Sequence, residues 1–168
     1  YLPNRKCLTN IVEKIIPLLD ESTSLPYDLH IFGRGISDSY FERYLRPVKN
    51  VKYFGFVQDI DNKIREADVL LNPVLEGGGV QTKVIKTLAA GTTVISSETG
   101  ACGISRGICD EKLIRVEDED WGSYARNIIQ LNQEGESSIP TPPSFYETYY
   151  WRNNIPDVLE AITNINKN

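Results

Sequence analysis

The stretch DVLLNPVLEGGGVQTKVIKTLAAGTTVISS, residues 68 to 97, decides the fold of this chain. It opens with a short apolar run, passes through three glycines, and then places Val84, Ile85 and Leu88 at the spacing of one helix face. Gly91 ends this helix, which we expect from about Val80 to Ala90, and TTVISS follows as a second strand. A strand, a helix and a strand in this order predict a βαβ unit with parallel strands.

The same alternation runs through most of the remaining sequence. Apolar runs predict further strands at 27–33, 51–57 and 112–116. Helices are predicted over about 5–19 behind Asn4 as a cap, over 37–45, 59–67 and 121–129, and after Asn154. Strands that alternate with helices predict the α/β class, as a doubly wound parallel sheet with helices on both faces.

The 168 residues make up about one domain and can bury one substantial core. We therefore expect a single domain over 1–168, with a connector at 135–143 and a C-terminal helical tail at 144–168. The chain begins at Tyr1, directly ahead of a helical pattern. We expect it to be a fragment whose upstream domain is missing.

Charge and cysteine content exclude several functional classes. A net charge of −5 and a pI near 5.0, without a basic stripe, predict no nucleic-acid partner. Cys7, Cys102 and Cys109 lack metal-like spacing and His30 is the only histidine, so neither a metal site nor a disulfide framework is predicted. No apolar run approaches the ~20 residues of a membrane helix. These features are typical of a reduced, cytosolic chain.

Three loops are predicted at the carboxyl edge of the sheet, where open α/β folds bind their ligands. They are Gly33-Arg34-Gly35, the segment of Phe56 and Val57, and the segment from Glu76 to Thr82. In the last loop, Gly77, Gly78 and Gly79 allow a ligand to approach the backbone, and the N–H groups of Val80, Gln81 and Thr82 lead into a helix N-terminus. Together these groups fit a phosphate or a diphosphate.

Lys83 stands in the first helical turn, where a cation is disfavoured by about 0.3 to 1 kcal/mol. A bound anion explains its presence, and Glu76 just ahead of the loop could accept hydrogen bonds from sugar hydroxyls. A nucleotide-sugar satisfies both features. Plainer interpretations stay open: the glycines form only a sharp turn, Lys83 and Lys86 form a solvated helix face, and Arg34 is a solvated loop residue.

The ordered motifs YDLHIFGRG, VKYFGFVQDI, ADVLLNP, EGGGVQTK, AAGTTVISS and TGACGI span residues 27 to 104. This run resembles the carboxyl-terminal, donor-binding half of the group 1 (family 4) retaining glycosyltransferases of the GT-B fold, and the likeness continues more weakly toward both ends. The resemblance implies sugar transfer from a nucleotide-diphospho-sugar without a bound metal or other cofactor. It implies donor contacts for Phe56, Val57, Glu76 and the glycine loop. From the residues themselves we expect Glu76 to orient the sugar and Lys83 to stabilise the departing diphosphate, as the catalytic pair.

The resemblance also implies a sugar, lipid-linked or polysaccharide acceptor, and a place for the full-length enzyme in the cytoplasm or at the inner membrane face. One motif residue departs from the pattern: the second glutamate, which grips ribose in the family, is Lys86 here. A lysine has only donors and cannot accept those hydrogen bonds. Lys86 slightly favours one alternative, a catalytically degenerate nucleotide-sugar-binding module. A nucleotide-sugar epimerase on the same fold is a separate alternative.

Overall fold

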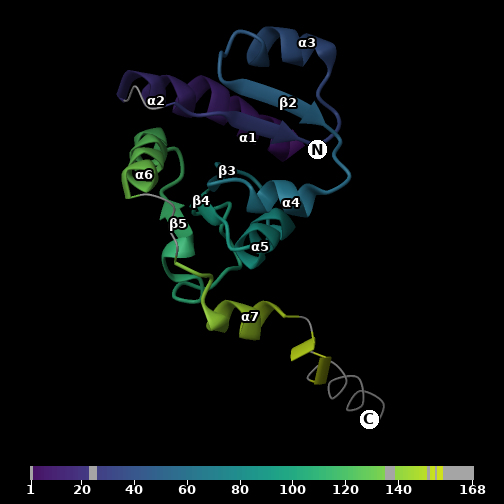
Figure 1. Ribbon diagram of the computed structural model, residues 1–168, viewed down its shortest axis with the longest axis vertical. Coiled ribbons are helices and arrows are strands. Elements are labelled where there is room, and N and C mark those ends of the chain that lie inside the picture. Colours follow the sequence, from purple (N-terminus) through teal and green to yellow (C-terminus); the bar gives the residue numbers. More distant parts are fainter. Residues whose placement is uncertain (1, 23–25, 135–138, 151, 154, 157–168) are drawn as a thin grey trace.

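The computed structural model describes residues 2–22, 26–134, 139–150, 152–153 and 155–156. Short parallel strands form its centre, and helices lie on both sides of them (Figure 1). The α/β class with parallel strands and helices on both faces is confirmed. The strands are β1 (Leu29–Phe32), β2 (Val51–Gly55), β3 (Val69–Asn72), β4 (Thr93–Ser97) and β5 (Leu113–Val116).

The helices connect successive strands, and most of them fall where the sequence places them. Asp59 caps the helix after β2, because its carboxylate accepts the N–H of Asn62 at 2.9 Å. The helical segments are α1 (Leu2–Asn10), α2 (Ile16–Ser22), α3 (Asp38–Tyr40), α4 (Ile60–Arg65), α5 (Thr82–Ala89), α6 (Trp121–Glu134) and α7 (Pro143–Tyr149), with π-helical turns at Ile11–Ile15 and Phe41–Leu45 and a 3₁₀ turn at Asp110–Lys112.

α1, the π-helical turn Ile11–Ile15 and α2 follow one another without a break and form one continuous first helix. Pro17 lacks an N–H and would clash with the carbonyl four residues earlier in a regular α-helix. The π-helical turn Ile11–Ile15 lies just ahead of it, and the N–H of Ile16 bonds to the carbonyl of Ile11. The helix begins at Leu2, so the prediction of Asn4 as its cap is wrong. Asn4 lies inside the first turns instead.

The strands form two sheets, whereas the sequence predicted one. β1 pairs with β2 in the first sheet, and the second has the order β3-β4-β5. Every pairing is parallel, with Leu29 opposite Val51 in the first sheet and Val69 opposite Thr93 in the second. β1 and β3 each have a neighbour on one side only. All residues of these five strands are described.

Two hydrophobic clusters cover the two faces of the β3-β4-β5 sheet. On one face α1, α2 and α6 pack over the sheet, and on the other face α5 and α7 do so, with α5 and α6 on opposite sides in Figure 1. Fully burying one large apolar side chain contributes about 1.5 to 3 kcal/mol. The buried members are Cys7, Ile11, Ile15, Ile16, Val74, Ile95, Val116 and Tyr124 on the first face, and Val84, Leu88, Val94, Ala101, Ile104, Cys109, Leu113 and Phe145 on the second.

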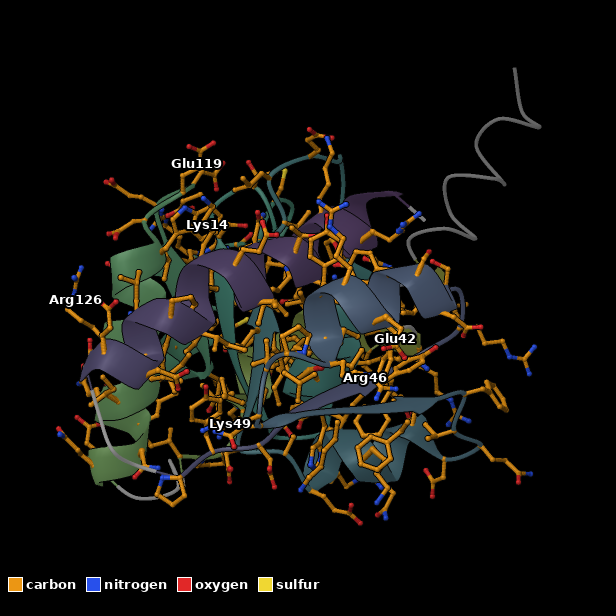
Figure 2. All side chains as sticks on the ribbon, turned by 90° about the horizontal axis from the view of Figure 1, so that it is seen from above. Lys14, Glu42, Arg46, Lys49, Glu119 and Arg126 are labelled. Atoms are coloured by element: carbon orange, nitrogen blue, oxygen red, sulfur yellow. The ribbon has the colours of Figure 1, made fainter. Side chains whose placement is uncertain are left out.

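The C-terminal part of the chain is described up to α7 and in two short helical pieces after it. α7 begins at Pro143, and Phe145 is 1% exposed, so an aromatic of the tail belongs to the core. Of the predicted connector at 135–143, residues 135–138 lie outside the described residues, and so does most of the helix predicted after Asn154. The exposed acidic and basic side chains labelled in Figure 2 lie spread around the molecule. None of the described helices is long and apolar enough to span a membrane.

Candidate functional site

A buried polar network fixes the backbone at the carboxyl edge of β3 and β4. The amide of Asn72 donates to Ser96 Oγ at 2.9 Å and to the carbonyl of Gly100 at 3.2 Å. Ser97 Oγ donates to the carbonyl of Val74 at 2.5 Å and accepts the N–H of Gly100 at 3.0 Å. The three polar side chains are fully buried, where each hydrogen bond is costly to lose. The network therefore joins the segment that leads to Glu76 to the loop after β4.

The glycine loop between β3 and α5 depends on backbone conformations that suit glycine. Gly77 has φ of +137° and Gly79 has φ of +77°. A Cβ on Gly103, in the loop after β4, would lie 2.7 Å from Val80 Cγ2, so the two loops are in close contact. Gln81 precedes α5 and Thr82 begins it. The loop thus reaches the helix N-terminus as predicted, with its three glycines exposed.

Glu76 and Lys83 both reach the first turns of α1. The carboxylate of Glu76 accepts from Lys6 Nζ at 2.5 Å. Lys83 Nζ donates to Asn4 Oδ1 at 3.2 Å, and burial lowers the pKa of this lysine. The buried thiol of Cys7 lies near enough to interact electrostatically with Lys83. The predicted catalytic pair therefore meets one shared helix.

A cleft of about 400 Å³ opens between α1, α3 and the segment after β3. Such a volume suits a small-molecule ligand. Glu76 lies in its wall together with two cations of α1 that the sequence analysis missed, Arg5 and Lys6. A signal was present, because these residues are basic and stand near a helix N-terminus, as Lys83 does. The wall is completed by Thr9, Asn10, Tyr40 and Leu75.

The two other predicted loops meet each other. The N–H of Gly33 bonds to the carbonyl of Gly55 at 2.7 Å, and the Arg34 guanidinium lies 4.3 Å from the centre of the Phe56 ring. Phe56 is 63% exposed, so one aromatic face remains open beside this cation. Gly35 is exposed and Val57 half-buried at the ends of these loops. No hydrogen bond or ion pair in the described part of the chain joins Arg34 or Phe56 to Glu76.

Lys86 points to a different neighbour from Lys83. Its Nζ lies 3.9 Å from a carboxylate oxygen of Asp61, in the first turn of α4, and both side chains are more than half exposed. Such a surface pair contributes little to stability. Lys86 therefore lies on the side of α5 that faces the helix after Phe56 and Val57, whereas Lys83 faces α1.

The described residues contain no group of His, Cys, Asp and Glu side chains that could hold a metal ion. The charged chemistry of the site is therefore that of Glu76, the cations of α1 and α5, and the backbone N–H groups of the glycine loop. These groups can hold an anion and accept hydrogen bonds from hydroxyl groups without a proton transfer.

Fold and site together define an α/β domain with a candidate ligand cleft at the carboxyl edge of parallel strands. Residues 1–134 match the family described as glycosyl transferases group 1. The chain belongs to this family. No curated protein matches the chain significantly.

Solved structures show the same fold. The structure of Anabaena Alr3699/HepE in complex with UDP matches with a TM-score of 0.65 at 12% identity, over 92% of this chain and 44% of that chain. The HepE structure in complex with UDP-glucose matches with a TM-score of 0.56 at 14% identity, over 73% of this chain and 35% of that chain. The fold is therefore the Rossmann-like fold of GT-B glycosyltransferases. This chain spans less than half the length of these structures.

Proposed function

We propose that this domain binds a nucleotide-diphospho-sugar as the donor for retaining sugar transfer, in the manner of the family 4 enzymes. The observation that carries the proposal is the cleft in which Glu76 and Lys6 meet beside a glycine loop that opens a helix. A sugar requires hydrogen-bond acceptors and a diphosphate requires cations and N–H donors. Family membership supports the same assignment. A uridine diphospho-sugar is the first donor to test, because HepE was solved with UDP and with UDP-glucose.

Each group has a distinct task in this proposal. The N–H groups of Gly79, Val80 and Gln81 meet the diphosphate, whose charge increases as the sugar leaves. Lys83 supplies positive charge from the first turn of α5, and Lys6 supplies it from the wall of the cleft. Glu76 accepts hydrogen bonds from the sugar hydroxyls and so orients the donor. No bound metal is needed for this stabilisation, since fixed cations perform it.

The nucleoside has a candidate place beside Phe56 and Val57. The exposed ring of Phe56, with the Arg34 guanidinium on it, offers an aromatic surface on which a base can stack. In this arrangement Lys86 contacts the donor near the ribose, next to Asp61. Because an ammonium group cannot accept from ribose hydroxyls, any such acceptor has to come from another residue.

We further propose that the full-length protein transfers a hexose to a sugar, lipid-linked or polysaccharide acceptor in the synthesis of a polysaccharide or glycolipid. The acceptor is bound between this domain and an upstream domain, so the 168-residue chain alone does not transfer sugar. The enzyme works in the cytoplasm or peripherally at the inner membrane face. Sugar transfer by the isolated chain would contradict the proposal that transfer requires both domains.

One observation favours a second candidate, a catalytically degenerate nucleotide-sugar-binding module. Lys86 stands where the family has its ribose-binding glutamate. Calorimetry with several nucleotide-sugars separates the two, because a degenerate module shows no selective donor binding. A nucleotide-sugar epimerase is distinguished by epimer formation from the donor without any acceptor.

Calorimetric titration of the full-length protein with UDP and UDP-glucose tests the proposal. Lys6→Met and Lys83→Met remove a charge but keep most of the side-chain volume, and each is expected to weaken UDP binding about 10-fold or more, since a hydrogen bond to a charged group contributes about 1.5 to 3 kcal/mol. Glu76→Gln is expected to weaken the binding of UDP-glucose more than the binding of UDP. Lys14→Met is the control, because Lys14 is exposed and is not among the residues that line the cleft. Equal affinities of Lys6→Met, Lys83→Met and the parent protein would refute the roles of the cations.

A further inference from the structure

The cleft beside Glu76 carries more positive than negative charge. The described residues of its wall include two cations, Arg5 and Lys6, and one carboxylate, that of Glu76. Lys6 Nζ and the Glu76 carboxylate form an ion pair at 2.5 Å, with both side chains partly exposed to solvent. The charge of Lys6 is therefore balanced inside the cleft, whereas the charge of Arg5 is not balanced by any described residue of the wall.

The guanidinium of Arg5 has an aromatic neighbour in place of a carboxylate. No acidic side chain of the described residues forms an ion pair with Arg5, whereas Arg46 pairs with Glu42 at 2.5 Å (Figure 2). The Arg5 guanidinium lies 5.4 Å from the centre of the Tyr40 ring. A guanidinium on an aromatic ring keeps the N–H groups along its edge for other acceptors, and this planar fork matches the two oxygens of a carboxylate.

Tyr40 is a rigid support for this cation. Its side chain is 8% exposed, and its ring centre lies 4.7 Å from that of Tyr44. The Thr9 hydroxyl has one hydrogen and donates it to the carbonyl of Arg5 at 3.0 Å, so in the 2.8 Å contact between Thr9 and Tyr40 the phenol is the donor. The ring is thus fixed from both ends. Arg5 loses less conformational freedom on binding an anion when it stacks on a fixed surface.

Arg5 and Lys83 lie on different sides of α1. The neighbours of Lys83 on this helix are Asn4 and Cys7, which are three residues apart and share one side. Arg5 faces Tyr40 instead and lines the cleft, whose described wall does not include Lys83. The proposed function places the diphosphate at the glycine loop and Lys83. The charge of Arg5 is therefore directed toward another part of the ligand.

We propose that the donor sugar carries a carboxylate, so that the transferred hexose is a hexuronic acid, and that Arg5 is the residue that recognises this carboxylate. The inference rests on the proposed function, in which Glu76 orients the sugar. A sugar in the cleft of about 400 Å³ presents hydroxyl groups to Glu76 and its carboxylate to Arg5, beside Tyr40. A neutral hexose offers Glu76 the same hydroxyl groups but brings no negative charge to Arg5.

Calorimetry of the full-length protein with matched donors tests the inference. UDP-glucose and UDP-glucuronic acid differ only at C6 of the sugar, and UDP-galactose and UDP-galacturonic acid repeat the comparison with the other configuration at C4. In at least one pair we expect the uronic acid to bind about 10-fold or more tightly than the neutral sugar, because a hydrogen bond to a charged group is a strong one.

The outcomes separate this inference from the proposed function. Binding of UDP without a preference for the uronic acid in either pair would overturn the inference and leave the donor site standing. Absence of binding by UDP and by all four donors would overturn both.

Two arginine variants locate the preference in the cleft. Arg5→Gln removes the charge and the fork, and is expected to bring the affinity ratio of uronic to neutral donor close to 1. Arg43→Gln is the matched control, because the Arg43 guanidinium lies 5.2 Å from the centre of the Tyr44 ring but does not line the cleft. Its ratio should equal that of the parent protein. Arg5→Lys keeps the charge without the planar fork and should retain only part of the preference.

The same variants can overturn the role of Arg5. An unchanged ratio in Arg5→Gln would show that another residue meets the carboxylate. A loss of affinity for UDP as large as the loss for the uronic donor would place Arg5 on the diphosphate. Either result contradicts the recognition of a sugar carboxylate by Arg5.

Discussion

Gly100→Ala is expected to be among the most destabilising single-methyl additions in this domain. A Cβ at this position would lie 2.6 Å from Asn72 Nδ2, 2.7 Å from Ser96 Oγ and 2.8 Å from Ser97 Oγ. These distances are 0.6 to 0.8 Å shorter than the 3.4 Å at which ordinary contact begins (3.4 − 2.8 and 3.4 − 2.6). All three atoms belong to buried side chains that hold the carboxyl edge together.

The magnitude follows from two costs. Overpacking by one methyl group costs about 1 to 3 kcal/mol. Movement of the polar atoms also weakens at least one buried hydrogen bond, which costs about 1 kcal/mol or more. The sum is about 2 to 4 kcal/mol, a large share of the about 5 to 15 kcal/mol that stabilises a typical domain. At a denaturant slope of about 2 kcal/mol/M in urea, the midpoint should fall by about 1 to 2 M.

Urea unfolding followed by circular dichroism measures this shift. Gly78→Ala is the matched control, because a Cβ on Gly78 meets nothing within 4 Å and its φ is not in the left-handed region. The control should change stability by less than about 1 kcal/mol. Adding Ser96→Ala removes one of the clashing oxygens, so the double variant should lose less than the sum of the single losses. A loss below about 1 kcal/mol for Gly100→Ala would refute the steric argument.

Three further predictions concern the donor loop, the ribose side and the pH dependence. Gly103→Ala should weaken UDP binding more than Gly107→Ala, measured by calorimetry, because both glycines have φ near +80° but only a Cβ on Gly103 would meet Val80, at 2.7 Å. Lys86→Glu should raise the affinity for UDP relative to the affinity for inorganic diphosphate, because diphosphate has no ribose and the new carboxylate can accept hydrogen bonds from ribose hydroxyls. An unchanged ratio of the two affinities would contradict a place of residue 86 near the ribose. Burial raises the pKa of the Cys7 thiol, so the folded state keeps a proton that the unfolded state loses above about pH 9, and the stability from this group is lost as the pH rises through that range. Burial lowers the pKa of Lys83, so the effect of this group on stability has the opposite sign, and stability rises as the pH increases through the alkaline range. Cys7→Ala should therefore reduce the fall in the urea midpoint of unfolding above pH 9 and leave the rise due to Lys83 in place.

Much of the fold could be predicted because the sequence is locally consistent. The apolar run at 69–72, the glycine loop and the spacing of Val84 and Leu88 all indicate the βαβ unit that the structure contains. The first helix was predicted with an incorrect start, because Asn4 has the chemistry of a cap but its side chain accepts from Lys83. That contact joins residues 79 positions apart, and no local pattern contains it.

The site was predictable to the level of loops but not of partners. Sequence position gives the strand end at which Glu76 lies, because carboxyl ends of parallel strands share one edge. It does not give the rotation of α5, which turns Lys83 toward Asn4 and Lys86 toward Asp61. The Lys6–Glu76 pair was missed for the same reason, since it depends on how α1 crosses the strands.

α1 connects the stability of the domain to its proposed activity. The π-helical turn that continues α1 packs Ile11 and Ile15 into the core on one face of the β3-β4-β5 sheet, and the first turns of α1 carry Lys6, which donates to Glu76. An exposed ion pair contributes only about 0 to 1 kcal/mol, so the Lys6–Glu76 pair does not hold the helix in place; the buried side chains do. The cations of the cleft are therefore positioned by the hydrophobic packing of this helical segment against the sheet. A change that loosens this packing should weaken anion binding before the domain unfolds, whereas loss of the ion pair alone should leave the fold intact.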